Sequence, residues 1–238
     1  MVELDNIVKT FGTNQALQGI TCNFSPGQIT GVLGENGAGK STLLRIMAGT
    51  LPQDTGEIRM NGVAIPADAR RRAGALLFGG KSGLYEELTA LENIVYFAEL
   101  RGISRQVARE RTRKLARTFE MEHFMNVRAR NLSTGMRQKV AIARSLVHEP
   151  SLIMLDEPES GLDFAASALL NDFLREYASR GNTVIISSHS AGDILALCST
   201  VIVLHEGKMR VRSNLAVELA HASLSDSFDF IKRLVVEA

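Results

Sequence analysis

A glycine-rich segment near the N-terminus has the residue types and the spacing of a phosphate-binding loop. Residues 34–42 read Gly-Glu-Asn-Gly-Ala-Gly-Lys-Ser-Thr, follow an apolar run and match the pattern GxxxxGK[ST] in full. Backbone N–H groups of such a loop converge on phosphate oxygens, and the N-terminus of the next helix adds roughly half a positive charge. The segment therefore predicts binding of a nucleoside triphosphate. The residues expected to contact the nucleotide are Gly34, Glu35, Asn36, Gly37, Ala38, Gly39, Lys40, Ser41 and Thr42.

Two side chains of this loop carry separate expected roles. Lys40 supplies a full cation for the outer phosphates, and Ser41 offers a hydroxyl to Mg²⁺. The helix that begins at Lys40 should run to Met47 and stop near Gly49. An ordinary glycine-rich turn between a strand and a helix would not need the full pattern.

Asp156 and Glu157 form a second candidate chemical element. They follow the apolar run 152–155, which predicts a buried strand, and ligands of an open α/β sheet bind at the C-terminal ends of its strands. We expect Asp156 to hold Mg²⁺ through its water shell and Glu157 to orient a water for in-line attack on the γ-phosphate. The four apolar residues before the pair disfavour an ordinary acidic surface patch.

His189 and Ser133 complete the set of candidate residues. His189 follows the apolar strand pattern of residues 184–186. A lone histidine is usually structural, but at the end of a core strand beside the Asp156 strand it could reach the γ-phosphate. Ser133 stands before a helix whose apolar spacing lasts until Pro150, and we expect it to cap that helix. Taken alone, this second segment predicts only a capped amphipathic helix.

The elements that must position these residues alternate between strands and helices. Strand patterns occur around 2–7, 20–24, 55–60, 152–156, 183–187 and 201–205, a helix at about 164–180, and an Asn-Gly turn at 61–62. They predict an α/β phosphate-loop NTPase core with a parallel sheet, an N-terminal antiparallel β subdomain and an inserted α-helical subdomain. We expect one domain over 1–238. The core would occupy 1–80 and 150–213, the helical subdomain about 81–149, and a C-terminal helical cap 214–238.

Composition narrows the function classes. The 238 residues include 27 Lys plus Arg against 26 Asp plus Glu, so the net charge of +1 predicts no global attraction to nucleic acid or anionic lipid. Cys22 and Cys198 lack metal-ligand spacing and are expected to be buried thiols in a reducing compartment. No leader pattern or long apolar span is present, so we expect a cytoplasmic protein.

The combination of the phosphate loop, the Asp156–Glu157 strand, residues 131–138, residues 160–163 and His189 closely resembles the ATP-binding cassette family, the ATPase subunits of ABC transporters. The resemblance covers nearly the whole chain. It implies ATP and Mg²⁺ as ligands, with Mg²⁺ contacts from Ser41 and Asp156. It also implies catalytic roles for Lys40, Glu157 and His189, the last as the family's switch histidine.

The resemblance alone implies a role in ATP binding or dimer contact for four residues. Phe11 matches the aromatic residue on which adenine stacks, and Asp163 matches the loop that crosses the dimer interface. Ser133 and Gly135 match the signature motif. In this family two cassettes sandwich two ATP molecules head to tail, so Ser133 and Gly135 should address the γ-phosphate bound by Lys40 of a second copy.

The chain also departs from the family pattern. The signature carries Thr134 and Met136 where Gly and Gln are usual, a variant similar to export-type subunits with separate permeases. The segment 79–85 lacks the glutamine that normally contacts Mg²⁺ and the attacking water. Either Lys81 or Ser82 substitutes for it, or the role is dispensed with. Glu159 and Asp193 are milder changes.

Residues 79–89 and 133–139 are similar to sodium- and drug-efflux ATPase subunits of the NatA type. This similarity implies a homodimer, or a pair with a related cassette, that drives a separately encoded integral membrane permease. Export of sodium ions or of a drug-like or hydrophobic substrate is expected, at the inner face of the cell membrane and without a nucleic-acid partner. The alternatives are a soluble ABC ATPase in a non-transport assembly and a non-hydrolysing nucleotide sensor.

A basic run on the inserted helices has two possible interpretations. It is either a solvated face, which is the commoner case, or a contact with the permease or with lipid headgroups. Its members are Arg101, Arg105, Arg109, Arg111, Arg113, Lys114 and Arg117.

Overall fold

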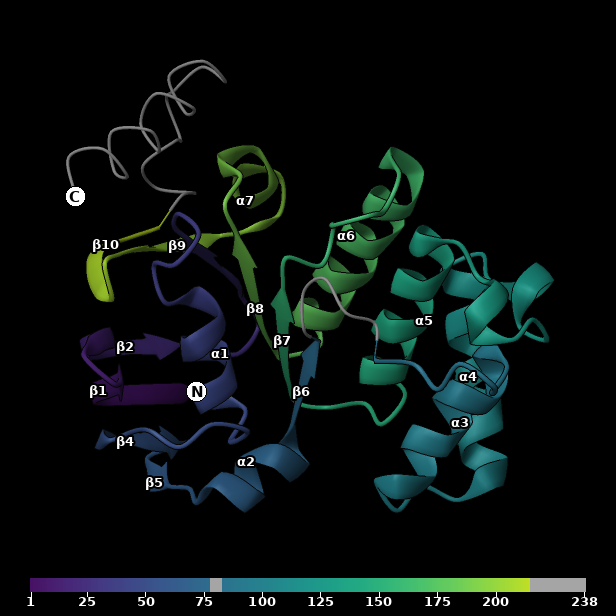
Figure 1. Ribbon diagram of the computed structural model, residues 1–238, viewed down its shortest axis with the longest axis horizontal. Helices are drawn as coiled ribbons and strands as arrows, with labels where there is room; N and C mark the ends of the chain where they lie inside the picture. The colour runs from purple at the N-terminus through teal and green to yellow at the C-terminus, as the bar shows by residue number, and fades with distance from the viewer. Residues whose placement is uncertain (78–82, 215–238) are drawn as a thin grey trace. The chain divides into compact units, whose positions relative to one another are not determined.

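Residues 1–77 and 83–214 are described by the structure, a computed structural model (Figure 1). They divide into two units. The first contains residues 1–76, 151–156 and those described from 177 onward. The second contains the described residues of 77–150 together with 157–176. The chain therefore crosses between units directly after Asp156.

The first unit opens with an antiparallel sheet in the order β2-β1-β4-β5. Its strands are β1 (Val2–Phe11), β2 (Asn14–Phe24), β4 (Thr55–Met60) and β5 (Val63–Ala64). Val2 and Leu4 are buried with period 2, and an irregularity in the β1–β2 register returns Ile7 to the buried side. Asn61 and Gly62, both with positive φ, join β4 to β5 and confirm the predicted hairpin turn.

A second sheet of the same unit has the order β10-β9-β3-β8-β7-β6. Its strands are β3 (Ile29–Leu33), β6 (Gly74–Leu77), β7 (Leu152–Asp156), β8 (Thr183–Ser188), β9 (Thr200–His205) and β10 (Lys208–Asn214). Strand β3 pairs in parallel with β8 and β9, and β7 pairs in parallel with β8. Every residue of β3, β7 and β8 is buried, as expected for central strands covered on both faces.

Helix α1 (Lys40–Met47) ties the two sheets into one core, and its bounds are those predicted. Leu43, Leu44 and Ile46 share a buried cluster with Ile7 of β1 and Met154 of β7. Two shorter helices, α2 (Ala67–Ala73) and α7 (Ala191–Leu197), complete the unit. The sequence patterns did not predict α2. The shared core fixes the start of α1, and thus the phosphate loop, against the parallel sheet.

The second unit is helical. It contains α3 (Ala90–Leu100), α4 (Arg105–Thr118), α5 (Thr134–Leu146), most of α6 (Phe164–Ser179) and the 3-10 turns Glu122–Phe124 and Ala129–Asn131. Helix α3 begins with a capping box, in which Thr89 accepts from the backbone N–H of Glu92 while the Glu92 side chain accepts from that of Thr89. The predicted α/β fold with a helical insertion is confirmed. The predicted C-terminal cap lies outside the described residues, except for Asn214, which ends β10.

Candidate functional site

The phosphate loop leaves β3 and turns tightly into α1. Gly37 and Gly39 have φ angles of 89° and 105°, which side chains other than that of glycine rarely tolerate. A Cβ atom at Gly39 would lie 2.6 Å from the carbonyl oxygen of Ala16, and one at Gly34 would lie 2.4 Å from that of Leu204. Glycine is thus required at both positions because neighbouring backbone approaches the loop closely.

Lys40 is held inside the curve of this loop. Its side chain is buried, and Nζ donates to the carbonyl oxygens of Gly34 at 2.7 Å and Glu35 at 3.0 Å. Gly39 caps α1 without a side-chain hydrogen bond, and the first turn of α1 holds no acidic residue. The ammonium group and the helix N-terminus therefore lie together, which makes the loop a site for an anion with several charges.

The strands of the parallel sheet bring three candidate segments to one edge. In the β3–β8 register, Leu33 pairs with Ser188, so the loop at Gly34 and His189 both begin one residue later. In the β7–β8 register, Asp156 pairs with Ser187. The phosphate loop, His189 and Asp156 therefore start within one residue of each other at the carboxyl end of the sheet, where ligands of such sheets bind.

Asp156 is a buried carboxylate whose orientation is fixed by the neighbouring strand. Ser187 Oγ donates to Asp156 Oδ1 at 2.5 Å, a short, charge-assisted hydrogen bond. A carboxylate oxygen at this position and the hydroxyl of Ser41 are hard oxygen ligands of the kind that Mg²⁺ prefers. The donor set present therefore fits the expected metal ion.

Glu157 directly follows Asp156 but adopts an unusual backbone conformation. Its φ angle is 47°, in the left-handed region that glutamate seldom occupies. The next residue, Pro158, is tied to the second unit because Gln138 Nε2 of α5 donates to its carbonyl oxygen at 2.9 Å. Gln138 is itself buried. Glu157 thus leaves the strand on a fixed, strained turn rather than on a regular extension of β7.

His189 is exposed at the end of β8. The residues around it are fixed by a small network, in which Ser188 Oγ donates to Asp193 Oδ2 at 2.8 Å and Ser190 Oγ donates to Asp193 Oδ1 at 3.0 Å. Ser190 also caps α7. Asp193, a mild departure from the family pattern, therefore anchors both residues that flank His189.

Phe11 lies at the end of β1 and is 48% exposed. The ammonium group of Lys9 stands over its ring, 5.5 Å from the centroid. A half-exposed aromatic ring at the tip of a hairpin offers a surface on which a flat ligand can stack. The structure places Phe11 in the same unit as the phosphate loop, Asp156 and His189.

The remaining candidates belong to the second unit with Glu157. Ser133 accepts a 3.3 Å hydrogen bond from the backbone N–H of Met136, which confirms the predicted cap of α5. A Cβ atom at Gly135 would lie 3.1 Å from the carbonyl oxygen of Gly161. Asp163 caps α6, since its Oδ1 accepts from the backbone N–H of Ala166 at 2.8 Å. The N-terminal turn of α5 therefore packs against the turn that precedes α6.

Four residues that support the site were not found from the sequence: Lys9, Asp54, Gln138 and Ser187. Each acts through a contact with a residue distant in the chain. The sequence patterns gave none of them a role, although Gln138 ends the segment 131–138 that carries the family resemblance. The loop 79–82, in which Lys81 or Ser82 was expected to replace a glutamine, lies outside the described residues.

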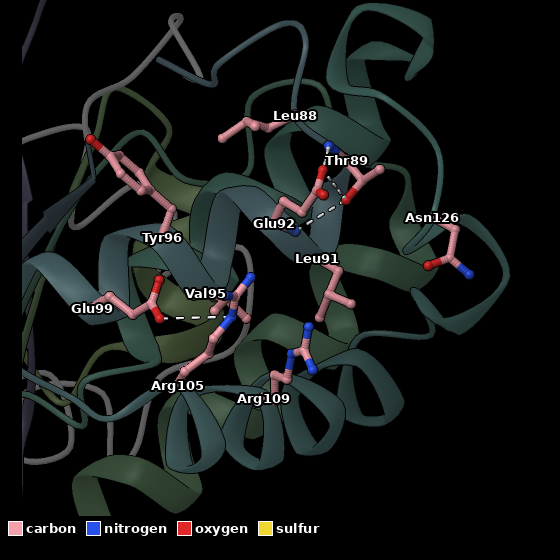
Figure 2. Close-up of a pocket in the computed structure, with 10 residues that line it drawn as sticks. All are labelled: Leu88, Thr89, Leu91, Glu92, Val95, Tyr96, Glu99, Arg105, Arg109 and Asn126. Atoms are coloured by element: carbon pink, nitrogen blue, oxygen red, sulfur yellow. Dashed lines mark hydrogen bonds and ion pairs between the residues drawn. The ribbon is translucent and has the colours of Figure 1, made fainter.

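A separate pocket of about 320 Å³ opens between α3 and α4 in the second unit. Arg105 and Arg109 project from α4 toward the side chains of α3 (Figure 2). Arg105 Nε lies 3.8 Å from Glu99 Oε1. The pocket is thus lined by apolar side chains together with charges of both signs. Its lining residues are Leu88, Thr89, Leu91, Glu92, Val95, Tyr96, Glu99, Arg105, Arg109 and Asn126.

Comparison with known proteins supplies the context for this geometry. The family model described as ABC transporter matches residues 17–160, more than half of the chain. The chain is 39% identical over 220 residues to the ABC transporter ATP-binding protein NatA of Bacillus subtilis, covering 91% of this chain and 89% of the relative. It is 33% identical over 208 residues to Nod factor export ATP-binding protein I of Paraburkholderia xenovorans, covering 87% and 68%.

A solved structure is also similar. It is the dimeric structure of a post-hydrolysis state of an ATP-binding cassette bound to ADP and Pi, with a TM-score of 0.80, 26% identity, and coverage of 90% of this chain and 99% of that chain. Among the helices of residues 1–77 and 83–214, none has the length and apolar character needed to span a bilayer.

Proposed function

Because this chain belongs to the ABC transporter family, we propose that it drives export through a separately encoded membrane permease. It is the ATP-binding subunit of an ABC transporter and an ATPase. The observation that best supports a hydrolytic role is the shared edge of the sheet, where the phosphate loop, Asp156 and His189 begin together. A protein that only bound nucleotide would not need a second carboxylate, Glu157, directly after Asp156 in the chain.

In the proposed mechanism, the phosphate loop binds the triphosphate through its backbone N–H groups and through Lys40, whose ammonium is already held at the loop by two carbonyl oxygens. Phe11 stacks on the adenine ring. Ser41 and Asp156 would hold Mg²⁺, which would supply positive charge against the phosphates. Pre-positioned cations and N–H groups stabilise the charge that develops at the γ-phosphate, which is where most of the catalysis in such reactions arises.

Glu157 orients the attacking water and accepts its proton, while His189 contacts the γ-phosphate and responds to its loss. The left-handed backbone of Glu157 supports this role, because strained conformations of this kind persist at positions that the surrounding structure fixes. The carboxylates of Asp156 and Glu157 have different surroundings. Ser187 donates a hydrogen bond to Asp156 itself, whereas Gln138 donates to the carbonyl oxygen of Pro158, the residue after Glu157.

A second copy of the chain completes the site in this proposal. The N-terminus of α5, with Ser133 and Gly135, faces the γ-phosphate bound by Lys40 of the other copy, and the turn at Asp163 crosses the interface. The similar solved cassette is dimeric in a post-hydrolysis state bound to ADP and Pi, which supports the pairing of two copies of this chain. ATP binding then closes the dimer, and hydrolysis reopens it.

The permease is proposed to dock on the second unit, at the pocket between α3 and α4. Its apolar lining residues can receive a hydrophobic side chain, while Arg109 can pair with an acidic residue of a cytoplasmic permease segment. This gives the basic run of α4 a partner. Reversal of charge at Arg109 and Arg113 should then uncouple ATP hydrolysis from transport, and a variant that transports normally would remove this docking site.

The cargo is proposed to be sodium ions or a drug-like or hydrophobic substrate. This is supported by the similarity to NatA and to an export ATP-binding protein. Export predicts that cells lacking this chain accumulate the cargo. Measurement of sodium and dye efflux in such cells distinguishes the two cargo classes.

Replacement of Glu157 by Gln tests the function directly. The amide keeps the size and polarity of the side chain but cannot accept the proton, so hydrolysis should fall by about 10²–10⁴-fold while ATP binding persists. Glu159→Gln, two residues on, is the matched control and should retain turnover. Undiminished hydrolysis by Glu157→Gln would overturn the assignment.

Co-purification of the tagged chain with an integral membrane protein tests the permease, and recovery only with soluble partners would refute export.

A further inference from the structure

Asp54, just before β4, holds the end of β1 with three hydrogen bonds. Its Oδ1 accepts from Lys9 Nζ at 2.7 Å, and its Oδ2 accepts from the backbone N–H of Thr10 at 2.7 Å. Its own backbone N–H donates to the carbonyl oxygen of Val8 at 2.9 Å. One residue thus fixes three consecutive positions of β1 directly before Phe11.

The end of β1 needs such a contact because its ladder to β4 stops there. The last β1–β4 pair is Val8 with Thr55, and the β1–β2 register shifts between Lys9 and Thr10. From Thr10 onward, the side of β1 that faces β4 therefore lacks the strand partner that would hold it. The carboxylate of Asp54 takes the place of that strand by accepting from the Thr10 N–H.

Lys9 connects the same carboxylate to the aromatic ring. Only 11% of its side chain is exposed although it carries a charge, and its ammonium lies over the Phe11 ring. A cation over an aromatic face is attracted by the ring electrons within about 6 Å of the centroid. One face of Phe11 is thereby taken, so a nucleobase must stack on the opposite face.

We propose that Asp54, acting through Lys9 and Thr10, is the positioning residue that orients Phe11 toward the nucleobase and so sets affinity for the base rather than for the triphosphate. This inference rests on the proposed function, in which Phe11 stacks on adenine. The hydrogen bond from Lys9 lowers the pKa of Asp54 below its usual value, with a smaller contribution from the Thr10 N–H, so the carboxylate is charged at neutral pH.

A tryptophan at position 11 provides a direct reporter, because the chain contains no tryptophan. Phe11→Trp should change its fluorescence when MgATP is added, but not when magnesium tripolyphosphate, which has no base, is added. ATP that binds, as measured by equilibrium dialysis, without any change in fluorescence would refute stacking at position 11, which belongs to the proposed function.

Asp54→Asn and Lys9→Met in the Phe11→Trp background then test the positioning role itself. Both should raise the Kd for ATP by about tenfold, equivalent to about 1.4 kcal/mol, and leave the Kd for tripolyphosphate unchanged. Lys9→Met keeps the apolar stem and the Asp54–Thr10 bond, so it remains informative if Asp54→Asn folds poorly. Glu57→Gln is the matched control, because it removes an ion pair to Arg59 on β4 and should change neither affinity.

The outcomes separate a positioning role from a merely structural one. With Phe11 present, Asp54→Asn should raise the KM for ATP and leave kcat at saturating ATP unchanged. Equal losses of affinity for ATP and tripolyphosphate would overturn the inference, because a general disturbance of the fold weakens both. Unchanged ATP affinity in both variants, with a tryptophan that still responds to ATP, would also overturn it and leave stacking intact.

Discussion

The side-chain amide of Gln138 donates a 2.9 Å hydrogen bond to the carbonyl oxygen of Pro158, the residue after Glu157. Helix α5 carries Ser133 and Gly135 at its start and Gln138 one turn later. The same helix that is proposed to address ATP in a second copy therefore also restrains the turn that leads from Glu157. A movement of α5 on dimer closure would be transmitted to that turn through a direct bond.

Gln138→Glu should therefore lower kcat for ATP hydrolysis without a comparable change in KM. A carboxylate cannot donate to the Pro158 carbonyl, so two hydrogen-bond acceptors would face each other in a buried place. This costs about 1–3 kcal/mol. If the whole cost raises the activation free energy of hydrolysis, the rate falls roughly 5- to 150-fold. Steady-state kinetics on protein of verified folded fraction measures the effect. The same substitution at exposed Gln106 of α4 should be silent. An unaltered kcat in Gln138→Glu would show that the turn does not need this bond.

Ser187→Ala should destabilise the protein through Asp156. Both side chains are buried, and the substitution removes the donor to Asp156 Oδ1. Hydrogen bonds to charged groups contribute about 1.5–3 kcal/mol, and each kcal/mol corresponds to about 2–4 °C in Tm for a chain of this length. Thermal unfolding without nucleotide measures the loss. Ser151→Ala, at an exposed position before β7, is the control, and equal Tm values for the two variants would contradict the prediction.

The pH dependence of stability should expose the ion pair between Glu86 and Arg137. Arg137 donates to both carboxylate oxygens of Glu86, and this hydrogen bonding lowers the pKa of Glu86 below its usual value of 4.5. Because the pKa of Glu86 is lower in the folded state than in the unfolded state, the ion pair stabilises the fold fully above about pH 4.5. This stabilisation is lost as the pH falls through the pKa of Glu86 in the folded state. The difference in Tm between the protein and Glu86→Gln should be constant from pH 8 to 5 and should shrink below pH 4.

A difference that instead grew on acidification would show that Glu86 is not held charged by Arg137. Glu87→Gln, which removes the exposed partner of Arg130 at 2.8 Å, is the comparison variant.

Local signals predicted the strands and helices that carry the candidate site. The loop pattern with its apolar strand located α1 to the residue, and the apolar run before Asp156 located β7. Capping of α5 by Ser133 followed from a single residue type before a periodic helix. These features are all decided within a few residues of chain.

Contacts between distant segments were beyond such signals. Ser187 and Asp156 are separated by 31 positions and Asp54 and Thr10 by 44, and they meet only because particular strands are neighbours. Helix α2 was missed for a different reason. It is short, lacks a side-chain cap and buries only Arg70, so it has no apolar periodicity to detect.

Asp163 permits a last prediction, since the structure gives it a local role beside the interface role that the family resemblance implies. Its Oδ1 caps α6 through the Ala166 N–H, so Asp163→Ala should cost about 1 kcal/mol of stability, whereas Asp163→Ser retains a capping oxygen and should restore most of it. Thermal unfolding separates the two variants.

If the only role is the cap, Asp163→Ser should also hydrolyse ATP normally. We expect instead that Asp163→Ser stays stable but that its rate of ATP hydrolysis no longer rises cooperatively with ATP concentration. In this variant α6 is intact, but the carboxylate proposed to cross the dimer interface is gone. Normal, cooperative hydrolysis by Asp163→Ser would confine Asp163 to the capping of α6.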